Sequence, residues 1–160
     1  MSQNSLLLLR LSLSSLLHHC LGIYVQNQSS PSCLFANESI RIISKSSFDS
    51  NSDPIFKELE LLKLNDVRQL ELGKLMFSFN RSLLPLKFHN YFSLNKQVHS
   101  YASRYANDFH LPFCRTNFRK FSVSFQVPTF YNSLNNDIKE SNSLHSFRTK
   151  LKKYLYELLA

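Results

Sequence analysis

The sequence predicts a mainly α-helical domain with a small β element, that is, an α+β fold. Apolar residues recur at helical spacing over residues 54–83 and again over residues 143–158. A short run at residues 121–125 instead alternates between apolar and polar residues, which is typical of a half-buried strand. With 160 residues, of which 43% are hydrophobic, the chain is long enough to bury one core of ordinary size.

The first 39 residues are predicted to form a helix and a linker. Residues 4–26 indicate one leucine-rich helix. Arg10 interrupts the apolar run at residues 6–17, which is too short and too polar for a membrane span. No basic segment precedes this run and no small-residue cleavage site follows closely, so a buried helix or degenerate leader is favoured over a signal peptide or anchor. Residues 27–39 are rich in Ser, Asn and Pro, which indicates a connecting loop.

A helical hairpin is predicted around residues 54–83. Asp53 is expected to cap its first helix, because the carboxylate accepts hydrogen bonds from free backbone N–H groups and Pro54 suits the first helical position. Asn65 is expected to cap the second helix, with Asp66 beside the positive end of the helix dipole. A short link between two such helices predicts that they pack against each other.

The segments on either side of this hairpin have weaker patterns. Residues 40–43 fit either a helical turn or a strand, and residues 44–52 indicate a polar loop. Residues 86–94 indicate a third, short helix with an aromatic face. Residues 96–118 contain little periodicity and are predicted to be mostly irregular.

The β element is predicted as a short strand or hairpin around residues 108–126. In FSVSF at residues 121–125, three apolar side chains share one face and two serines share the other. Pro128 is expected to end the strand. We therefore predict that most aromatic residues of this region belong to the core: Phe109, Phe113, Phe121, Phe125, Phe130 and Tyr131.

An amphipathic helix is predicted at the C-terminus, with Ser143 as its cap. Its apolar stripe consists of Leu144, Phe147, Leu151, Leu155 and Leu158. Its polar face carries Arg148, Lys150, Lys152 and Lys153. These cations also suit the negative end of the helix dipole.

The charge balance favours RNA or DNA as a partner. The net charge is +8, and residues 101–160 hold nine basic residues against four acids. A basic region of this kind fits nucleic acid or another anionic surface, although a solvated face without a partner has the same composition. The candidate nucleic-acid contacts are Arg104, Arg115, Arg119, Lys120, Arg148, Lys150, Lys152 and Lys153. Tyr101, Tyr105 and Phe118 lie nearby and offer faces for stacking.

Catalytic and metal-binding patterns are missing from the sequence. His99, His110 and Cys114 are the best candidate metal ligands, but no fourth ligand lies at a usual spacing. No nucleophile motif, phosphate loop or adjacent Asp pair is present. We therefore predict no catalytic residue, metal, cofactor or small-molecule substrate. Three cysteines without CxxC spacing fit reduced thiols in a cytoplasmic or nuclear protein rather than a secreted one.

An ordered set of segments from about Ile40 to Leu155 resembles the C-terminal region of reverse transcriptases of non-LTR retrotransposons, the jockey-like group. The set includes HSYASR, HLPFCRTNFRKFSVSFQ, FYNSL and SFRTKLKKYL. The matching motif residues are His99, Tyr101, Arg104, Pro128, Asn132, Ser133 and Leu134. Four positions depart from the family pattern: Ser103 replaces Thr, Val127 replaces Gly, Tyr131 replaces Trp and Asn135 replaces Pro.

The resemblance implies that residues 40–160 form a module like this tail. The family's polymerase chemistry lies in a palm domain with an Asp-Asp box, and neither that domain nor the endonuclease is expected in this chain. The implied function is that of a non-catalytic remnant with residual, non-specific nucleic-acid binding. The alternatives are a structural remnant without molecular function, or a small secreted or membrane-anchored protein.

Overall fold

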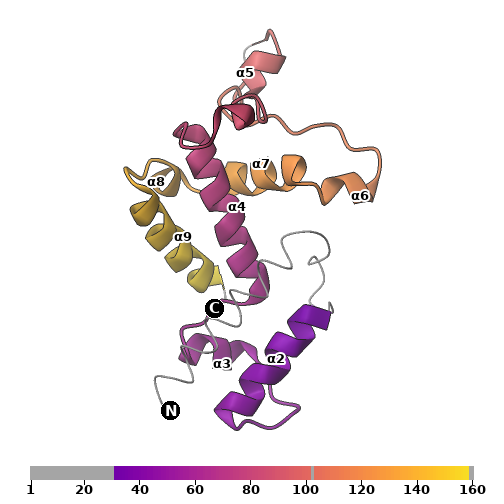
Figure 1. Ribbon diagram of the computed structural model, residues 1–160, viewed down its shortest axis with the longest axis vertical. Helices are drawn as coiled ribbons and strands as arrows, with labels where there is room; N and C mark the ends of the chain where they lie inside the picture. The colour runs from indigo at the N-terminus through magenta and orange to yellow at the C-terminus, as the bar shows by residue number, and fades with distance from the viewer. Residues whose placement is uncertain (1–30, 102, 159–160) are drawn as a thin grey trace. The chain divides into compact units, whose positions relative to one another are not determined.

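The computed structural model describes residues 31–101 and 103–158 (Figure 1). These residues form eight α-helices and one short 3-10 helix, and they contain no strand. The elements in chain order are α2 (Pro31–Ser44), α3 (Asp53–Glu58), α4 (Leu64–Asn80), η1 (Leu86–Phe88), α5 (Asn95–Val98), α6 (Asn117–Lys120), α7 (Val123–Ser133), α8 (Asn136–Lys139) and α9 (Leu144–Leu158). The prediction of a mainly helical chain is confirmed, whereas the predicted helix over residues 4–26 lies outside the described residues.

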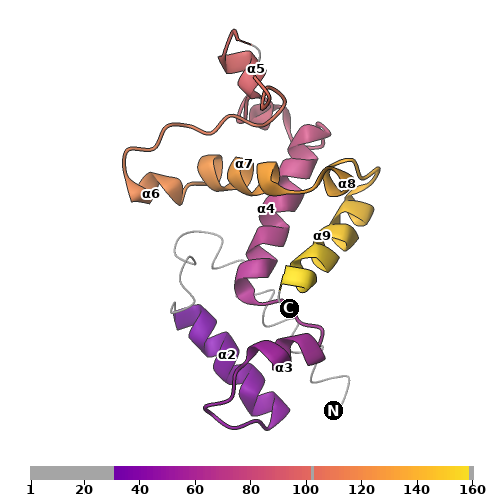
Figure 2. The ribbon, with the colours of Figure 1, turned by 180° about the vertical axis from the view of Figure 1, so that it is seen from behind.

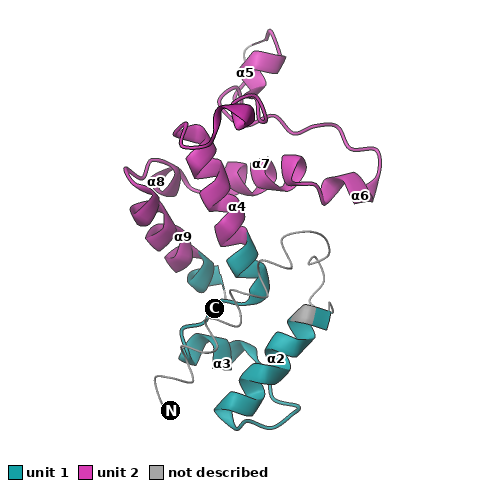
Figure 3. Cartoon of the chain, in the orientation of Figure 1, with its two compact units in different colours: residues 1–68, 155–160 teal, residues 69–154 magenta. Residues whose placement is uncertain are grey.

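The chain divides into two compact units (Figure 3). Unit 1 comprises residues 1–68 and 155–160, and unit 2 comprises residues 69–154. One boundary therefore falls inside α4 and the other inside α9. Because α2 begins at Pro31 and ends at Ser44, one continuous helix runs across position 40, where the module expected over residues 40–160 would begin.

The core of unit 1 forms between α2, α3 and the link that follows α3. Ile40, Ile55, Phe56 and Leu61 are buried together, and Leu59 packs against them. The connecting loop predicted over residues 27–39 is therefore wrong from residue 31 onward. Cys33 and Ile40, seven residues apart, are both buried, which shows that this Ser- and Asn-rich stretch has an inward helical face.

Both helix starts in the predicted hairpin differ in detail from the expectation. Asp53 does not cap α3; it is the first helical residue, and its carboxylate pairs with Nζ of Lys63 at 2.8 Å. Asn65 lies inside the first turn of α4 rather than at its cap. Its Oδ1 atom is buried and accepts no hydrogen bond among the described residues. Two helices joined by a short link are present over the predicted range. The buried residues of α3, however, cluster with Ile40 of α2 and with the link rather than with α4 as the predicted hairpin requires.

The core of unit 2 is built from the inner faces of α4, α7 and α9. Met76, Phe77, Val127, Phe147 and Leu151 are at most 1% exposed. The rings of Phe77 and Phe147 stack with 4.6 Å between their centroids. Both ribbon views show α7 crossing α4 and α9 running alongside α4 (Figures 1 and 2). This packing buries Phe147 and Leu151 of the apolar stripe predicted for the last helix.

The predicted strand at residues 121–125 is wrong. Ser122 is the cap residue of α7, and the helix begins at Val123. The inward residues Val127, Tyr131 and Leu134 are spaced four and three apart, so a helical pattern begins where the short alternation ends. Phe121 and Val123 are 48% and 41% exposed, which leaves the apolar face of the alternating run largely open to solvent.

Pro128 does not end an element; it is buried inside α7. A proline at this position removes the N–H that would donate to the carbonyl of Ser124. The ring packs in the core of unit 2 instead, so burial of apolar surface offsets the missing hydrogen bond. The third helix predicted over residues 86–94 is also shorter than expected, because only Leu86–Phe88 forms a 3-10 turn.

One antiparallel bridge, between Leu94 and Phe109, is the β feature of the described residues. The N–H of His110 donates to the carbonyl of Ser93 at 2.8 Å, and the N–H of Asn95 donates to the carbonyl of Asp108 at 2.9 Å. An isolated bridge is not a strand, and Leu94 lies outside the predicted range, so the strand or hairpin predicted around residues 108–126 is not found in the described residues.

The start of α9 confirms the predicted cap. The Oγ atom of Ser143 accepts a hydrogen bond from the backbone N–H of Ser146 at 3.1 Å. Phe147, Leu151 and Leu155 are fully buried, whereas Leu144 and Leu158 at the helix ends are 37% and 65% exposed. The predicted apolar stripe is therefore confirmed for its central three residues.

Candidate nucleic-acid interface

The structure distributes the eight predicted cationic contacts over three places. Arg115, Arg119 and Lys120 lie just before α6 and in it, and Arg104 lies in the loop after α5. The remaining four are on α9. Both ribbon views place α6 and α9 on opposite sides of α4 (Figures 1 and 2). The eight residues therefore do not form one continuous surface.

Residues 113–121, here called the α6 segment, combine cations and aromatic rings most closely. Arg115, Arg119 and Lys120 are all exposed. Both ion pairs found in the described part of the chain lie elsewhere, at Lys63–Asp53 and Lys74–Glu71. The α6 segment contains no acid. Its three charges are thus available to an external anion.

The phenylalanines of the α6 segment are also exposed, which corrects the core prediction for two of them. Phe113 is 86% exposed, Phe118 is 74% exposed and Phe121 is 48% exposed. Phe109 and Tyr131 are 6% and 3% exposed, so the prediction is confirmed for these two. One feature of the sequence distinguishes the exposed from the buried rings. Phe113 follows Pro112 in a stretch without periodicity, whereas Tyr131 belongs to a helical pattern of apolar residues.

Hydrogen bonds hold the backbone on both sides of the α6 segment. On its N-terminal side, the amide of Asn132 holds the backbone of Phe109: the Phe109 N–H donates to Oδ1 at 3.1 Å, and Nδ2 donates to the Phe109 carbonyl at 2.9 Å. On its C-terminal side, the Ser122 hydroxyl donates to the carbonyl of Arg119 at 2.7 Å. Ser122 is also the residue that directly precedes α7. Asn132 thus ties the backbone four residues before the α6 segment to α7, whereas the contact at its C-terminal end is local.

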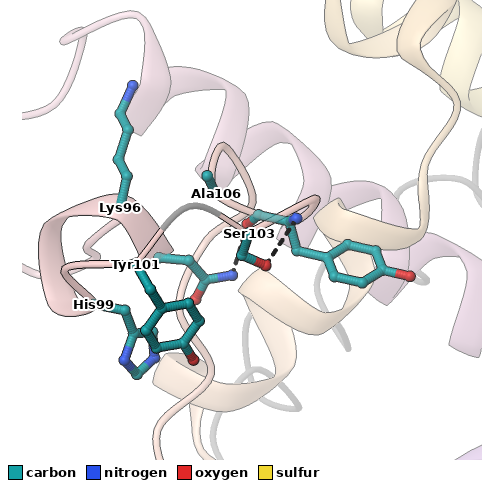
Figure 4. A pocket seen from close by; sticks show the side chains of 7 residues that line it. Lys96, His99, Tyr101, Ser103 and Ala106 are labelled. Atoms are coloured by element: carbon teal, nitrogen blue, oxygen red, sulfur yellow. Dashed lines mark hydrogen bonds between the residues drawn. The ribbon is translucent and has the colours of Figure 1, made fainter.

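His99, Tyr101 and Ser103 of the HSYASR stretch line a small pocket of about 170 Å³ (Figure 4). His99 and Tyr101 stack with their ring centroids 5.3 Å apart, and Figure 4 shows them together on one side of the pocket. Ser103 accepts a hydrogen bond from the Tyr105 N–H at 3.2 Å. Tyr101 and Tyr105 are 66% and 67% exposed, and Arg104 between Ser103 and Tyr105 is exposed as well.

Residues 128 and 132–134, in α7 and directly after it, make structural contacts. Pro128 and Leu134 are buried, and Asn132 holds Phe109 as described above. The Ser133 hydroxyl donates to the carbonyl of Phe130 at 2.7 Å. Pro128 and Leu134 are thus covered by the core, Asn132 is engaged by the backbone of Phe109, and Ser133 is exposed.

The cations of α9 differ in their surroundings. Arg148, Lys150 and Lys153 are exposed, and Lys152 is half-buried. The Lys150 ammonium donates to the carbonyl of Asp137 at 2.9 Å, so it stabilises the connection between α8 and α9. The α9 face therefore combines structural contacts with positive charge, and it carries no exposed aromatic ring comparable to Phe113 or Phe118.

The candidate metal ligands do not converge within the described residues. His99 and His110 approach each other edge to face with ring centroids 5.5 Å apart. The Cys114 thiol donates to the carbonyl of Pro112. Residues 31–101 and 103–158 contain no group of three His, Cys, Asp or Glu side chains that could hold a metal ion. Over the same residues, no helix combines the length and apolar character needed to cross a lipid bilayer.

Comparison of the chain with known protein families, curated proteins and solved structures finds no match.

Proposed function

We propose that the chain is a non-catalytic module that binds nucleic acid through the α6 segment. The observation that carries this proposal is the grouping of Arg115, Arg119 and Lys120 with three exposed phenylalanines on one acid-free segment. Cationic side chains neutralise phosphates and release condensed counterions, which supplies most of the free energy of non-specific binding. The net charge of +8 adds a long-range attraction for polyanions.

We further propose that this module derives from the C-terminal region of a non-LTR retrotransposon reverse transcriptase. The ordered motifs from Ile40 to Leu155 support this origin. The contact of Asn132 is consistent with this origin, because a residue of the matching motif holds the backbone of Phe109, four residues before the α6 segment. The module has no catalytic residue of its own and no cofactor, and it acts in the cytoplasm or nucleus, where nucleic acids are present.

A fluorescence anisotropy titration tests the binding proposal. Labelled single-stranded RNA and duplex DNA are titrated with the full chain from about 50 mM to about 200 mM salt. We expect binding at the lower salt concentration and a steep loss of affinity at the higher one. Absence of binding at about 50 mM salt would contradict the proposal, because phosphate contacts are strongest there.

A charge-matched pair of variants locates the interface. The α6 variant is Arg115→Gln/Arg119→Gln/Lys120→Gln, and the control is Lys45→Asn/Lys57→Gln/Lys87→Gln, which removes three exposed cations elsewhere. Asn is chosen at residue 45 because its backbone φ is 55°, which asparagine tolerates. We expect the α6 variant to lose most of the affinity and the control to lose little. Equal losses would show that net charge alone is responsible.

A further inference from the structure

We infer that the α6 segment selects single-stranded over duplex nucleic acid by stacking unpaired bases on the rings of Phe113 and Phe118. The inference rests on the proposed function and names its substrate class. The two rings are 86% and 74% exposed. Neither ring belongs to the cluster in which the rings of Phe79, Phe92 and Phe109 pack edge to face.

The chemistry of phenylalanine explains the selectivity. In a duplex the base faces are covered by neighbouring base pairs, and a phenyl ring has no donor or acceptor with which to read the edges in the grooves. A single strand exposes its base faces, and each base that stacks on an aromatic side chain contributes to affinity with little dependence on sequence. The exposed rings of Phe113 and Phe118 therefore favour unpaired bases.

The spacing of charges and rings supports the same ligand. Arg115 lies two residues after Phe113 in a stretch without helical structure. In extended backbone such side chains lie on the same side, so the guanidinium and the ring can contact the same nucleic-acid strand. Arg119 and Lys120 directly follow Phe118 in α6. A single strand offers phosphates and bases in alternation along its length, which matches an alternation of cations and rings.

An anionic membrane is the competing partner for a basic and aromatic surface. Membrane-bound helices separate a wide apolar face from a charged face over several turns. Here α6 has four residues, and polar Thr116 and Asn117 and the cations stand between the phenylalanines. The absence of such a separation favours nucleic acid, and vesicles of phosphatidylcholine and phosphatidylserine provide the test.

The chain contains no tryptophan, so Phe118→Trp introduces a single reporter at the proposed stacking position. The variant is titrated with oligouridine, oligothymidine and a duplex DNA of equal length, and tryptophan emission is recorded beside ligand anisotropy. We expect both single strands to quench the emission and the duplex to leave it nearly unchanged. Equal affinity for duplex and single strands, or single-strand binding without quenching, would overturn the inference. Absence of binding in the anisotropy channel would instead overturn the proposed function.

Ring deletion gives a second, independent readout. We expect Phe113→Ala/Phe118→Ala to weaken single-strand binding by about tenfold or more and to leave duplex affinity unchanged. Phe35→Ala/Phe48→Ala is the matched control, because those rings are 60% and 72% exposed in unit 1. Circular dichroism verifies that each variant is folded.

Phe118→Leu separates stacking from simple apolar contact. Leucine retains a large apolar side chain but has no aromatic face, so we expect single-strand affinity to fall as far as it does for the single variant Phe118→Ala. Full affinity with leucine would overturn the stacking account. Binding to the mixed vesicles that exceeds binding to single strands, and that is lost in the same variants, would assign the segment to membranes instead.

Discussion

Asn132 joins α7 to the extended backbone at Phe109 through two hydrogen bonds of 3.1 and 2.9 Å. One amide side chain thereby satisfies both the N–H and the C=O of a buried residue. We predict that Asn132→Ala lowers the free energy of unfolding by about 2 kcal/mol, because both backbone groups lose their partner. Urea denaturation measures the change. Ser133→Ala, at the exposed neighbouring position, should cost much less, and equal costs would contradict this role.

Asp66 lies in the first turn of α4, and one of its carboxylate oxygens is buried without accepting a hydrogen bond among the described residues. Burial raises the pKa of Asp66 above its ordinary value of 3.8, although Lys63 opposes the shift. The folded chain therefore binds this proton more readily than the unfolded chain. The contribution of Asp66 to stability consequently falls as pH rises from 3.8 through the raised pKa.

We predict that Asp66→Asn raises the melting temperature at pH values above the raised pKa, because it removes a carboxylate whose charged form is penalised by burial. The gain should shrink as pH falls toward 3.8, where Asp66 of the parent chain becomes protonated. Thermal unfolding followed by circular dichroism over this range measures it. Asp49→Asn, at an exposed loop position, is the control. A gain for Asp66→Asn that does not vary with pH would contradict the account.

Gly73 sets how closely α4 and α9 approach each other. A Cβ atom at this position would stand 2.6 Å from Cδ2 of Leu151 and 3.3 Å from the ring of Phe130. Leu151 is fully buried, so its side chain has little room to move away. Overpacking of a core costs about 1–3 kcal/mol, whereas alanine gains about 1 kcal/mol over glycine in helix propensity.

We therefore predict that Gly73→Ala destabilises the chain in urea denaturation. In the background of Leu151→Ala, where the obstructing methyl groups are absent, the same substitution should be stabilising. This reversal of sign is the distinctive result. Stabilisation in both backgrounds would mean that α4 and α9 do not pack through Gly73.

The elements that the sequence predicted correctly are those whose pattern extends over several turns. The last helix has an apolar residue at every turn and a capping serine, and both features are present in α9. Short patterns were ambiguous: five alternating residues at 121–125 are too few to distinguish a strand from a helix start. The strand was predicted wrongly because the five residues were considered without those that follow them. Val127, Tyr131 and Leu134 are buried at helical spacing, which indicates a helix.

At the scale of the whole molecule, the sequence predicted which residues are charged but not which of them lie together. Arg148 and Lys150 belong to the same basic third as Arg119, yet α9 and α6 are on opposite sides of α4 (Figure 1). The exposure of Phe113 could not be predicted from its type, because phenylalanine is usually buried. The contact of Asn132 with Phe109 was equally invisible in the sequence, because it joins residues 23 positions apart.

The salt dependence of single-strand binding tests the central claim most directly. Each phosphate contact with a single strand contributes about 0.7 to the negative slope of log K against log salt. If Arg115, Arg119 and Lys120 contact phosphates, the triple glutamine variant should bind oligouridine with a slope shallower by about 2 than that of the parent chain. The charge-matched variant at residues 45, 57 and 87 should retain the parent slope. A slope that is the same for all three proteins would contradict the claim that the α6 segment is the nucleic-acid interface.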